Sequence, residues 1–287
     1  MIPIVAAWMT STAIFYAFAC YFAFEYKRSE DCLRSPALRA LKPGTTPGGF
    51  FKTTLLVAVV MILVLSAMVF ILRRFPRIFD TINEAAVFFS FFVLPYTFRK
   101  KQTASSVATI LFFAGEIVFA TVATRYWETH PNWITNNICA FVVGIVILLT
   151  FRTVTNRQCA AVSLGIMAFD AFSVFVSGQM QRLVEATGDH AGTSIAIPAG
   201  LSPANPSVFS TGLGDLVVPG FVVLLAYRTY GKRGAAGAIA GYLAGMLVAL
   251  VALLASDFPQ PATIYLIPGA YFGFWVATAR VRKRQLA

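Results

Sequence analysis

The chain has 287 residues, of which 58% are hydrophobic and only 12% are charged, and its formal net charge is +11. Soluble domains carry about 25% charged residues, so this composition excludes an ordinary soluble enzyme and a disordered tail protein. It indicates a polytopic membrane protein. The basic residues lie between apolar runs, so we interpret the positive charge as a topology signal and expect no nucleic-acid partner.

Nine apolar runs follow one another along the chain, and each is long enough, or nearly so, for a membrane-spanning helix. In chain order they cover residues 2–24, 53–72, 82–98, 104–124, 134–151, 158–177, 208–227, 235–256 and 259–279. We therefore predict an all-α polytopic membrane protein with nine transmembrane helices, built as a single domain over residues 1–287. We expect its first five spans to lie within residues 1–157 and its last four within residues 158–287, with a long loop at 178–207.

The distribution of Lys and Arg predicts how these helices are oriented. With the amino terminus outside, the cytoplasmic connections and tail hold 18 basic residues and the outer connections hold five. Because cytoplasmic connections are enriched in Lys and Arg, we predict that the amino terminus is outside and the carboxyl terminus inside.

Three acidic residues, Glu116, Asp170 and Asp215, lie well inside predicted spans. A charge at that depth costs about 3 kcal/mol on insertion scales, so each is a candidate functional residue. Asp170 and Asp215 lie on consecutive antiparallel spans, each about 18 Å from the inner end. Two close carboxylates in a low dielectric share one proton, as in aspartic proteases, where one activates water and the other polarises the peptide carbonyl. For Glu116 we favour a packing role over a gate or a proton path.

Glycines have two different contexts in the last spans. Asp215 directly follows Gly212-Leu213-Gly214, where the missing Cβ atoms would let a peptide backbone approach the acid. In the eighth run the glycines recur at four-residue spacing, which predicts close helix packing. These are Gly237, Gly241 and Gly245. The four cysteines lack metal-ligand spacing, so we predict neither a metal nor a cofactor.

Three separated motifs resemble the signal peptide peptidase and presenilin family of intramembrane aspartyl proteases. The family's Tyr-Asp of the sixth span reads Phe169-Asp170 here, and its Gly-x-Gly-Asp of the seventh span reads Gly212-Leu213-Gly214-Asp215. Its Pro-Ala-Leu, which opens the ninth span, reads Gln260-Pro261-Ala262-Thr263. Residues 133–137 also resemble the start of the family's fifth span. The resemblance covers about residues 130 to 280, and the predicted orientation resembles the signal-peptide-peptidase branch.

The resemblance implies that Asp170 and Asp215 are the catalytic pair of an aspartic endopeptidase that cuts peptide bonds inside the bilayer. It implies a supporting role for the other motif residues, which are Phe169, Gly212, Leu213, Gly214, Gln260, Pro261, Ala262 and Thr263. Residues 158–287 would then hold the catalytic spans, and residues 1–157 the scaffold. Phe169 and Thr263 depart from the family's Tyr and Leu, which affects substrate preference and inhibitor affinity while leaving both acids in place.

The implied partners are transmembrane peptide or protein substrates within the lipid bilayer, namely signal-peptide remnants and type II membrane proteins. A homo-oligomer is compatible with this interpretation. An unwound substrate would pair with a strand edge, for which the candidates are residues 194–197 and those before Pro261. The implied location of this multi-pass protein is the endoplasmic reticulum membrane, or the plasma membrane for a prokaryotic chain.

Three alternatives use the same residues differently. A proton- or cation-coupled transporter or channel would use the intramembrane aspartates for ions. A prepilin-peptidase-like enzyme also has Gly-x-Gly-Asp, although it has no Pro-Ala-Leu motif. A catalytically inactive family member would act as a binding chaperone.

Overall fold

The computed structural model describes residues 2–21, 23, 76–98, 106–130, 132–150, 155–178, 194–198, 207–256 and 260–286, together with scattered positions between 55 and 74. The second predicted span, residues 53–72, therefore lies mostly outside the described residues. The described elements are helices apart from two short strands. They are α1 (Ile2–Cys20), α5 (Pro76–Phe98), α6 (Ser106–Thr129), α7 (Trp133–Thr150), α8 (Asn156–Ala171), the π-helix η2 (Phe172–Val176), β1 (Ser194–Pro198), β2 (Ser207–Gly212), α10 (Leu213–Ala255) and α11 (Thr263–Leu286).

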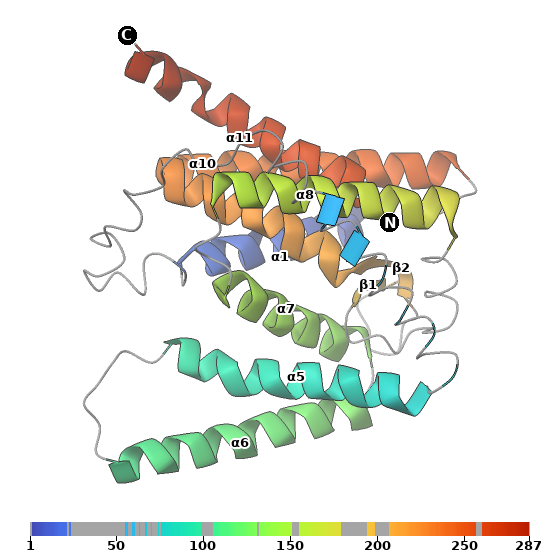
Figure 1. Ribbon diagram of the computed structural model, residues 1–287, viewed down its shortest axis with the longest axis vertical. Helices are drawn as coiled ribbons and strands as arrows, with labels where there is room; N and C mark the ends of the chain where they lie inside the picture. Colours follow the sequence, from blue (N-terminus) through green and yellow to red (C-terminus); the bar gives the residue numbers. More distant parts are fainter. Residues whose placement is uncertain are drawn as a thin grey trace.

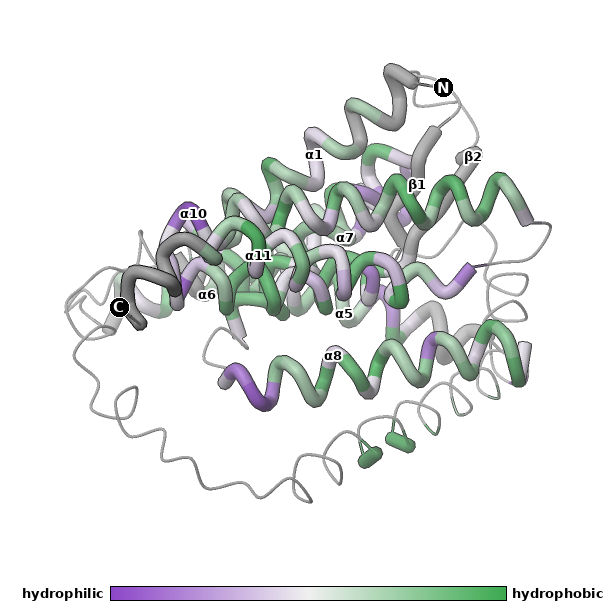
Figure 2. The backbone as a smooth tube through the Cα atoms, turned by 90° about the horizontal axis from the view of Figure 1, so that it is seen from above, coloured by the Kyte–Doolittle hydropathy of each residue, from purple (hydrophilic) through white to green (hydrophobic). Residues whose placement is uncertain are grey.

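The helices have the length and composition of membrane spans. Among the described residues, four stretches are long and apolar enough to cross a membrane, namely Ala108–Thr129, Trp133–Thr150, Asn156–Val176 and Leu213–Ala255. Shorter apolar helices occur at Met9–Cys20, Thr81–Pro95 and Thr263–Ala279. Figure 2 shows the hydrophobic residues along the helices and hydrophilic segments at the turn of α10 and the start of α8. The chain is thus a polytopic membrane protein, while nine spans and their orientation stay predictions.

Helix α10 is a helical hairpin, although its 43 residues form one hydrogen-bonded element. The backbone leaves helical geometry at Tyr230 and at Gly231, whose φ is +63°. In a straight helix Leu216 and Tyr242 would lie about 39 Å apart, yet both contact Tyr16 of α1. The chain therefore turns back at Gly231, and Figure 1 shows α10 crossing the molecule and returning. The two arms correspond to the predicted seventh and eighth spans.

Two clusters of buried apolar residues hold the helices together. The larger one joins α1, α7, α8, both arms of α10, and α11. The smaller one joins α5 and α6 to α7, which contributes to both clusters. In Figure 1 the α5–α6 pair lies at one side of the molecule and the α8, α10 and α11 group at the other. Large apolar side chains such as Phe89, Ile110 and Val122 remain exposed on the outer faces, as expected for contact with lipid.

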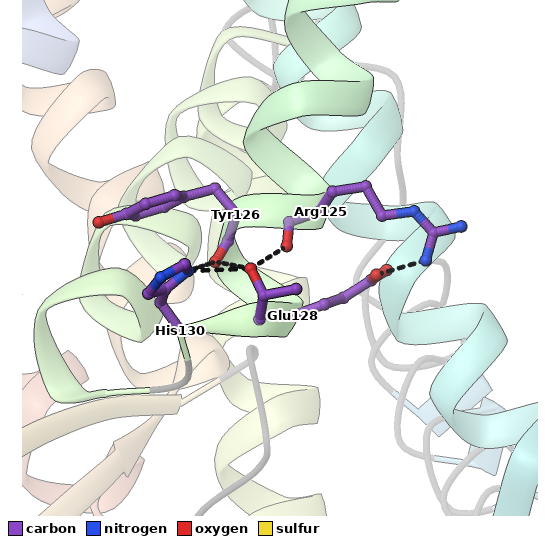
Figure 3. Close-up of polar contacts among 5 residues, drawn as sticks. Arg125, Tyr126, Glu128 and His130 are labelled. Carbon is purple, nitrogen blue, oxygen red and sulfur yellow. Dashed lines mark hydrogen bonds and ion pairs between the residues drawn. The ribbon is translucent and has the colours of Figure 1, made fainter.

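The start of α7 is organised by local polar contacts. The Trp127 indole donates to Asn136 Oδ1 at 2.7 Å and ties α6 to α7. The Thr135 hydroxyl donates to the His130 carbonyl at 2.8 Å, and the His130 ring stacks on Tyr126. Figure 3 shows this end of α6, including the ion pair between Arg125 and Glu128. The stretch of residues 133–137, which matched the family by sequence, thus shapes the α6–α7 connection.

Two short strands form a hairpin within the otherwise helical fold. Residues 194–198 pair antiparallel with residues 207–212, so that Ser194 lies opposite Gly212 and Ile197 opposite Phe209. The prediction of a strand at 194–197 is confirmed. The residues that pair with it had been predicted to form the start of the seventh span, which we expected to begin at residue 208. That boundary is wrong because β-branched and aromatic residues such as Val208 and Phe209 favour a paired strand over a helix start. The predicted loop at 178–207 therefore ends in a hairpin that leads directly into α10.

Candidate active site

Asp170 lies near the end of α8. The helix begins with a capping box, in which the Thr155 hydroxyl accepts from the Gln158 amide and the Gln158 side chain accepts from the Thr155 amide. It runs regularly to Ala171 and then widens into the π-helix η2. Short π-helical segments often occur at functional sites, and this one starts two residues after Asp170. The Asp170 side chain is buried.

Thr263, the first residue of α11, binds Asp170 directly. The Thr263 hydroxyl donates to Asp170 Oδ2 at 2.6 Å, and the Thr263 amide donates to the same oxygen at 3.1 Å. The hydroxyl bond has the length expected for a donor paired with a carboxylate. Two predicted site residues that are 93 positions apart are therefore in contact, and the departure from the family's Leu supplies the hydroxyl.

The sequence had suggested that Asp215 lies well inside a span. In the structure, Asp215 lies in the first turn of α10. Gly212 is the extended residue that precedes the helix, and its amide donates to Asp215 Oδ2 at 3.1 Å. This is the helix-capping geometry in which the side chain of the third helical residue accepts a hydrogen bond from the residue that precedes the helix. Leu213 and Leu216 of the same turn pack against Gly144 of α7.

The two aspartates lie equally far along their helices from one shared cavity. Asn156, at the start of α8, and Thr229, at the end of the first α10 arm, line one cavity at the same end of the molecule. Asp170 is fourteen residues from Asn156, and Asp215 is fourteen residues from Thr229. At 1.5 Å per residue, each acid is about 21 Å from that end. Because α8 packs against α10, this geometry brings the acids to one level on neighbouring helices.

The glycines beside Asp215 lie in open space. A Cβ atom added at Gly214 would have no neighbour within 4 Å among the described residues, and one added at Gly212 would meet only Asp215 Oδ2 and the Gly214 amide. Both glycines are exposed. Helix packing therefore does not account for either glycine, and the surface around Asp215 is open to another backbone.

The remaining motif residues lie where α10 passes into α11. The Gln260 amide group donates to the Ser256 hydroxyl at 2.8 Å and accepts from the Tyr265 hydroxyl at 3.1 Å, which joins the two helices. Pro261 is buried and Ala262 half-buried, and the Ala262 carbonyl accepts from the first α11 amides. These residues hold Thr263 at the start of α11, beside Asp170.

The remaining residues of interest are Phe169 and Glu116, which the sequence singled out, and two tyrosines that it did not. Phe169 is buried next to Asp170. Glu116 is buried on α6, whose neighbours are α5 and α7 and not the helices of the two aspartates. Sequence reasoning missed Tyr16 and Tyr242, two buried tyrosines close to Asp215. A hydroxyl in the middle of an apolar run was the available signal, but no motif surrounds either tyrosine.

Comparison with known proteins identifies the family. The family model described as signal peptide peptidase matches residues 1–286. Signal peptide peptidase-like 2C of Mus musculus is 26% identical over 207 residues, which is 62% of this chain and 30% of that protein. Signal peptide peptidase-like 2B of Rattus norvegicus is 24% identical over 210 residues, or 61% of this chain and 34% of that protein.

A probable intramembrane protease of Saccharomyces cerevisiae is 22% identical over 199 residues, again 61% of this chain and 34% of that protein. The matched region thus spans about a third of the length of these curated relatives. The family model, in contrast, extends over nearly the whole chain. The chain therefore belongs to the signal peptide peptidase family.

Proposed function

We propose that this chain is an intramembrane aspartyl protease and that Asp170 and Asp215 are its two catalytic acids. The observation that carries the proposal is that each acid lies fourteen residues from the same cavity on packed neighbouring helices, with Thr263 bound to one acid and glycines without described neighbours beside the other. Membership of the signal peptide peptidase family supports a protease and does not favour the transporter or channel alternative.

The proposed chemistry follows from two carboxyl groups that share one proton. The ionised group takes a proton from water, and the resulting hydroxide oxygen bonds to the peptide carbonyl carbon. The protonated group gives its proton to the carbonyl oxygen. The C–N bond then breaks as the acid that took the proton from water gives it to the amide nitrogen, while the other acid takes back a proton from a hydroxyl of the tetrahedral intermediate. A carboxylic acid and an amine leave, and the pair again shares one proton. The reaction consumes one water and needs neither a metal nor a cofactor.

Thr263 would orient Asp170 for this reaction. Both of its donors use Oδ2, so Thr263 leaves the second carboxylate oxygen, Oδ1, for water or substrate. Hydrogen bonds from two rigid donors restrict how the carboxylate can rotate. In this proposal Phe169 packs behind the acid, and Gln260, Pro261 and Ala262 hold Thr263 in position.

The substrate is proposed to be a transmembrane segment that unwinds before it is cut. A spanning helix satisfies its backbone hydrogen bonds internally, so the scissile amide must be released first. In the two-stranded sheet of β1 and β2, each strand has one edge that pairs with no other described strand. An unwound segment could add there as a further strand. β2 ends at Gly212, three residues before Asp215, so a strand added to the sheet would lead the substrate backbone to the acid.

The finer assignments follow the same branch of the family. Signal-peptide remnants and type II membrane proteins are the proposed substrates, and the endoplasmic reticulum membrane is the proposed location, or the plasma membrane for a prokaryotic chain. The amino-terminus-out orientation predicted from Lys and Arg supports this substrate direction, because inverting an asymmetric site would invert the direction it accepts.

A cleavage assay with matched variants tests the proposal. The full chain in liposomes would receive a signal-peptide-like spanning substrate, and the products would be separated by mass. We expect wild type to cut and Asp170→Asn and Asp215→Asn to lose at least about a thousandfold in kcat. Glu116→Gln is the matched control, because it neutralises an acid that is buried on another helix, and it should retain wild-type activity.

Each other outcome has a defined meaning. Cleavage by both asparagine variants would refute the two-aspartate mechanism. Binding without cleavage by wild type and by every variant would support the non-catalytic chaperone instead. Activity that depends on Glu116 as strongly as on the aspartates would overturn the assignment of the pair.

A further inference from the structure

A buried tyrosine of the first helix binds the backbone next to Asp215. Tyr16 of α1 is completely buried, and its hydroxyl donates to the Leu216 carbonyl at 2.6 Å. Leu216 directly follows Asp215 in the first turn of α10. A residue 200 positions away in the chain, outside every motif recognised above, therefore anchors the turn that carries the candidate acid.

A second tyrosine completes this contact from the other arm of α10. The Tyr242 ring packs edge-on against the Tyr16 ring, with centroids 5.2 Å apart and an interplanar angle of 86°. The two tyrosines are therefore in direct ring contact, and both lie near Asp215. Tyr242 is also buried. Helix α1 thus meets the first arm of α10 through the Tyr16 hydroxyl and the second arm through the ring of Tyr242, beside the turn that carries Asp215.

Within the described residues, the first turn of α10 lacks one helical hydrogen bond and has two glycines without close side-chain neighbours, so an external contact to its backbone adds restraint. Pro219 has no N–H, so it cannot donate the helical hydrogen bond to the Asp215 carbonyl. Gly212 and Gly214 are exposed and make no close side-chain packing of their own. The hydrogen bond from the Gly212 amide to Asp215 is local to this turn and does not connect it to another helix. The apolar contacts of Leu213 and Leu216 with Gly144 fix one side of the turn, and the Tyr16 hydroxyl adds a polar contact to the backbone itself.

The packing around Tyr16 is close on the side that faces α10. A Cβ atom added at Gly220, one turn after Leu216, would lie 3.2 Å from the Tyr16 ring and 2.8 Å from the Leu148 side chain. The glycine therefore lets the ring come near enough for its hydroxyl to reach the carbonyl. A phenylalanine at position 16 would fill the same space and would not bury a hydroxyl that needs a hydrogen-bond partner. Packing alone therefore does not explain why this residue is a tyrosine.

We propose that Tyr16 and Tyr242 are positioning residues that hold Asp215 in its reactive place. The inference rests on the proposed function of Asp215, and it extends the site to the first helix. The pair acts through the α10 backbone and not on substrate. Loss of the Tyr16 hydroxyl would let the first turn of α10 shift, so that fewer enzyme–substrate complexes reach the reactive geometry.

The test compares conservative variants of the full chain in liposomes. Tyr16→Phe and Tyr242→Phe each remove one hydroxyl and keep the ring, and Tyr21→Phe is the matched control directly after α1, because the Tyr21 side chain is exposed. With a fluorogenic spanning peptide, we expect Tyr16→Phe to lower kcat about tenfold, with KM changed less than about twofold. Tyr242→Phe should lower kcat less. The double variant should resemble Tyr16→Phe, because the two hydroxyls act as one unit. Tyr21→Phe should match wild type.

A second measurement does not depend on proteolysis. Hydrogen exchange, read by mass spectrometry on peptides that cover residues 213–220, should become faster in Tyr16→Phe and stay unchanged in Tyr21→Phe. Unchanged exchange together with wild-type kcat in Tyr16→Phe would overturn the inference, as would a rise in KM at constant kcat. If wild type cuts no substrate, the proposed function fails separately. The exchange result then decides by itself whether Tyr16 holds the turn.

Discussion

Glycines serve opposite purposes in two regions of α10. In the second arm, Gly237, Gly241 and Gly245 face α11, and a Cβ atom added at any of them would come within 2.6 Å of an α11 backbone carbonyl oxygen. At the start of the first arm, Gly214 would place a Cβ atom in open space. The same residue type therefore removes bulk between helices in one region and keeps a surface clear in the other.

This difference shows how to separate packing glycines from site glycines. The α10–α11 contact is the backbone-to-backbone type common between membrane helices, where small residues let two helices approach closely. Gly269 and Gly273 of α11 pack against the α10 backbone in the same way, since a Cβ atom at either would meet an α10 carbonyl oxygen. Near Asp215 no described residue fills the space that the glycines leave, and in the proposed function this space receives the substrate backbone. Substitutions in the two regions should then affect different measurements.

Gly241→Ala should have the largest effect and should act on folding. Its Cβ atom would lie 2.1 Å from the Gly269 carbonyl oxygen, and neither backbone can move aside without separating the helices. We expect a loss of about 3 kcal/mol in stability, with the protein failing to accumulate in membranes. Thermal unfolding in detergent and the amount of monodisperse protein measure this. A variant as stable as wild type would show that the interface is looser than the glycine contacts indicate.

Gly214→Ala should leave folding intact and impair cleavage. The added methyl group meets no described residue, and alanine favours a helix over glycine, so stability should stay within about 1 kcal/mol of wild type. A substrate backbone that approaches Asp215 would meet the methyl group, and we expect kcat/KM to fall about tenfold. Steady-state cleavage assays beside a melting curve test both halves. Destabilisation comparable to that of Gly241→Ala would remove the distinction between the two regions.

Thr263→Val tests the point at which α11 meets the acid on α8. Valine keeps the shape of threonine and the backbone donor but loses the hydroxyl that binds Asp170 Oδ2 at 2.6 Å. We expect kcat to fall about fivefold, with little change in KM, because the acid is less well oriented. Thr263→Ser should recover most of the activity. Equal rates for the valine and serine variants would mean that the hydroxyl is not used.

Gly115→Ala should have the smallest effect. Gly115 lies on α6, where an added Cβ atom would have no neighbour within 4 Å among the described residues, as at Gly214. It is far in the fold from both aspartates, because α6 packs against α5 and α7. Cleavage should be unchanged, and stability should rise by at most about 1 kcal/mol. Reduced cleavage in this variant would show that open glycines are sensitive anywhere in the chain.

The sequence predicted the fifth and sixth spans to within two residues. It missed the start of α5 and the ends of α6 and α11 by five to seven residues, and it missed the start of α10 where a strand replaces a helix end. The fifth span, expected at 134–151, is α7 at Trp133–Thr150, and the sixth, expected at 158–177, is α8 with η2 at Asn156–Val176. Apolar run length decides such spans, because a backbone in lipid must satisfy its own hydrogen bonds. The seventh span was drawn five residues too early, because the apolar Val208 and Phe209 extended the run, whereas residues 208–212 belong to β2 and pair with β1.

The pairing of site residues was visible only in part. Asp170 and Asp215 stood out because charged groups are rare at membrane depth. Thr263 was predicted as a site residue because it occupies the Leu position of the Pro-Ala-Leu motif. That position gave no indication that Thr263 contacts Asp170. Tyr16 and Tyr242 gave no signal that separates them from the other tyrosines.

The sequence by itself determined that this is a membrane protein of the signal peptide peptidase family, and it marked the two acids. These properties are local or additive, because hydropathy, charge counts and motif order need no knowledge of which helix lies beside which. Only the tertiary structure decided that α10 turns back at Gly231, that the Thr263 hydroxyl reaches Asp170, and that Tyr16 anchors the turn of Asp215. Such contacts join residues up to 200 positions apart. They depend on how helices pack in three dimensions, which no spacing along the chain records.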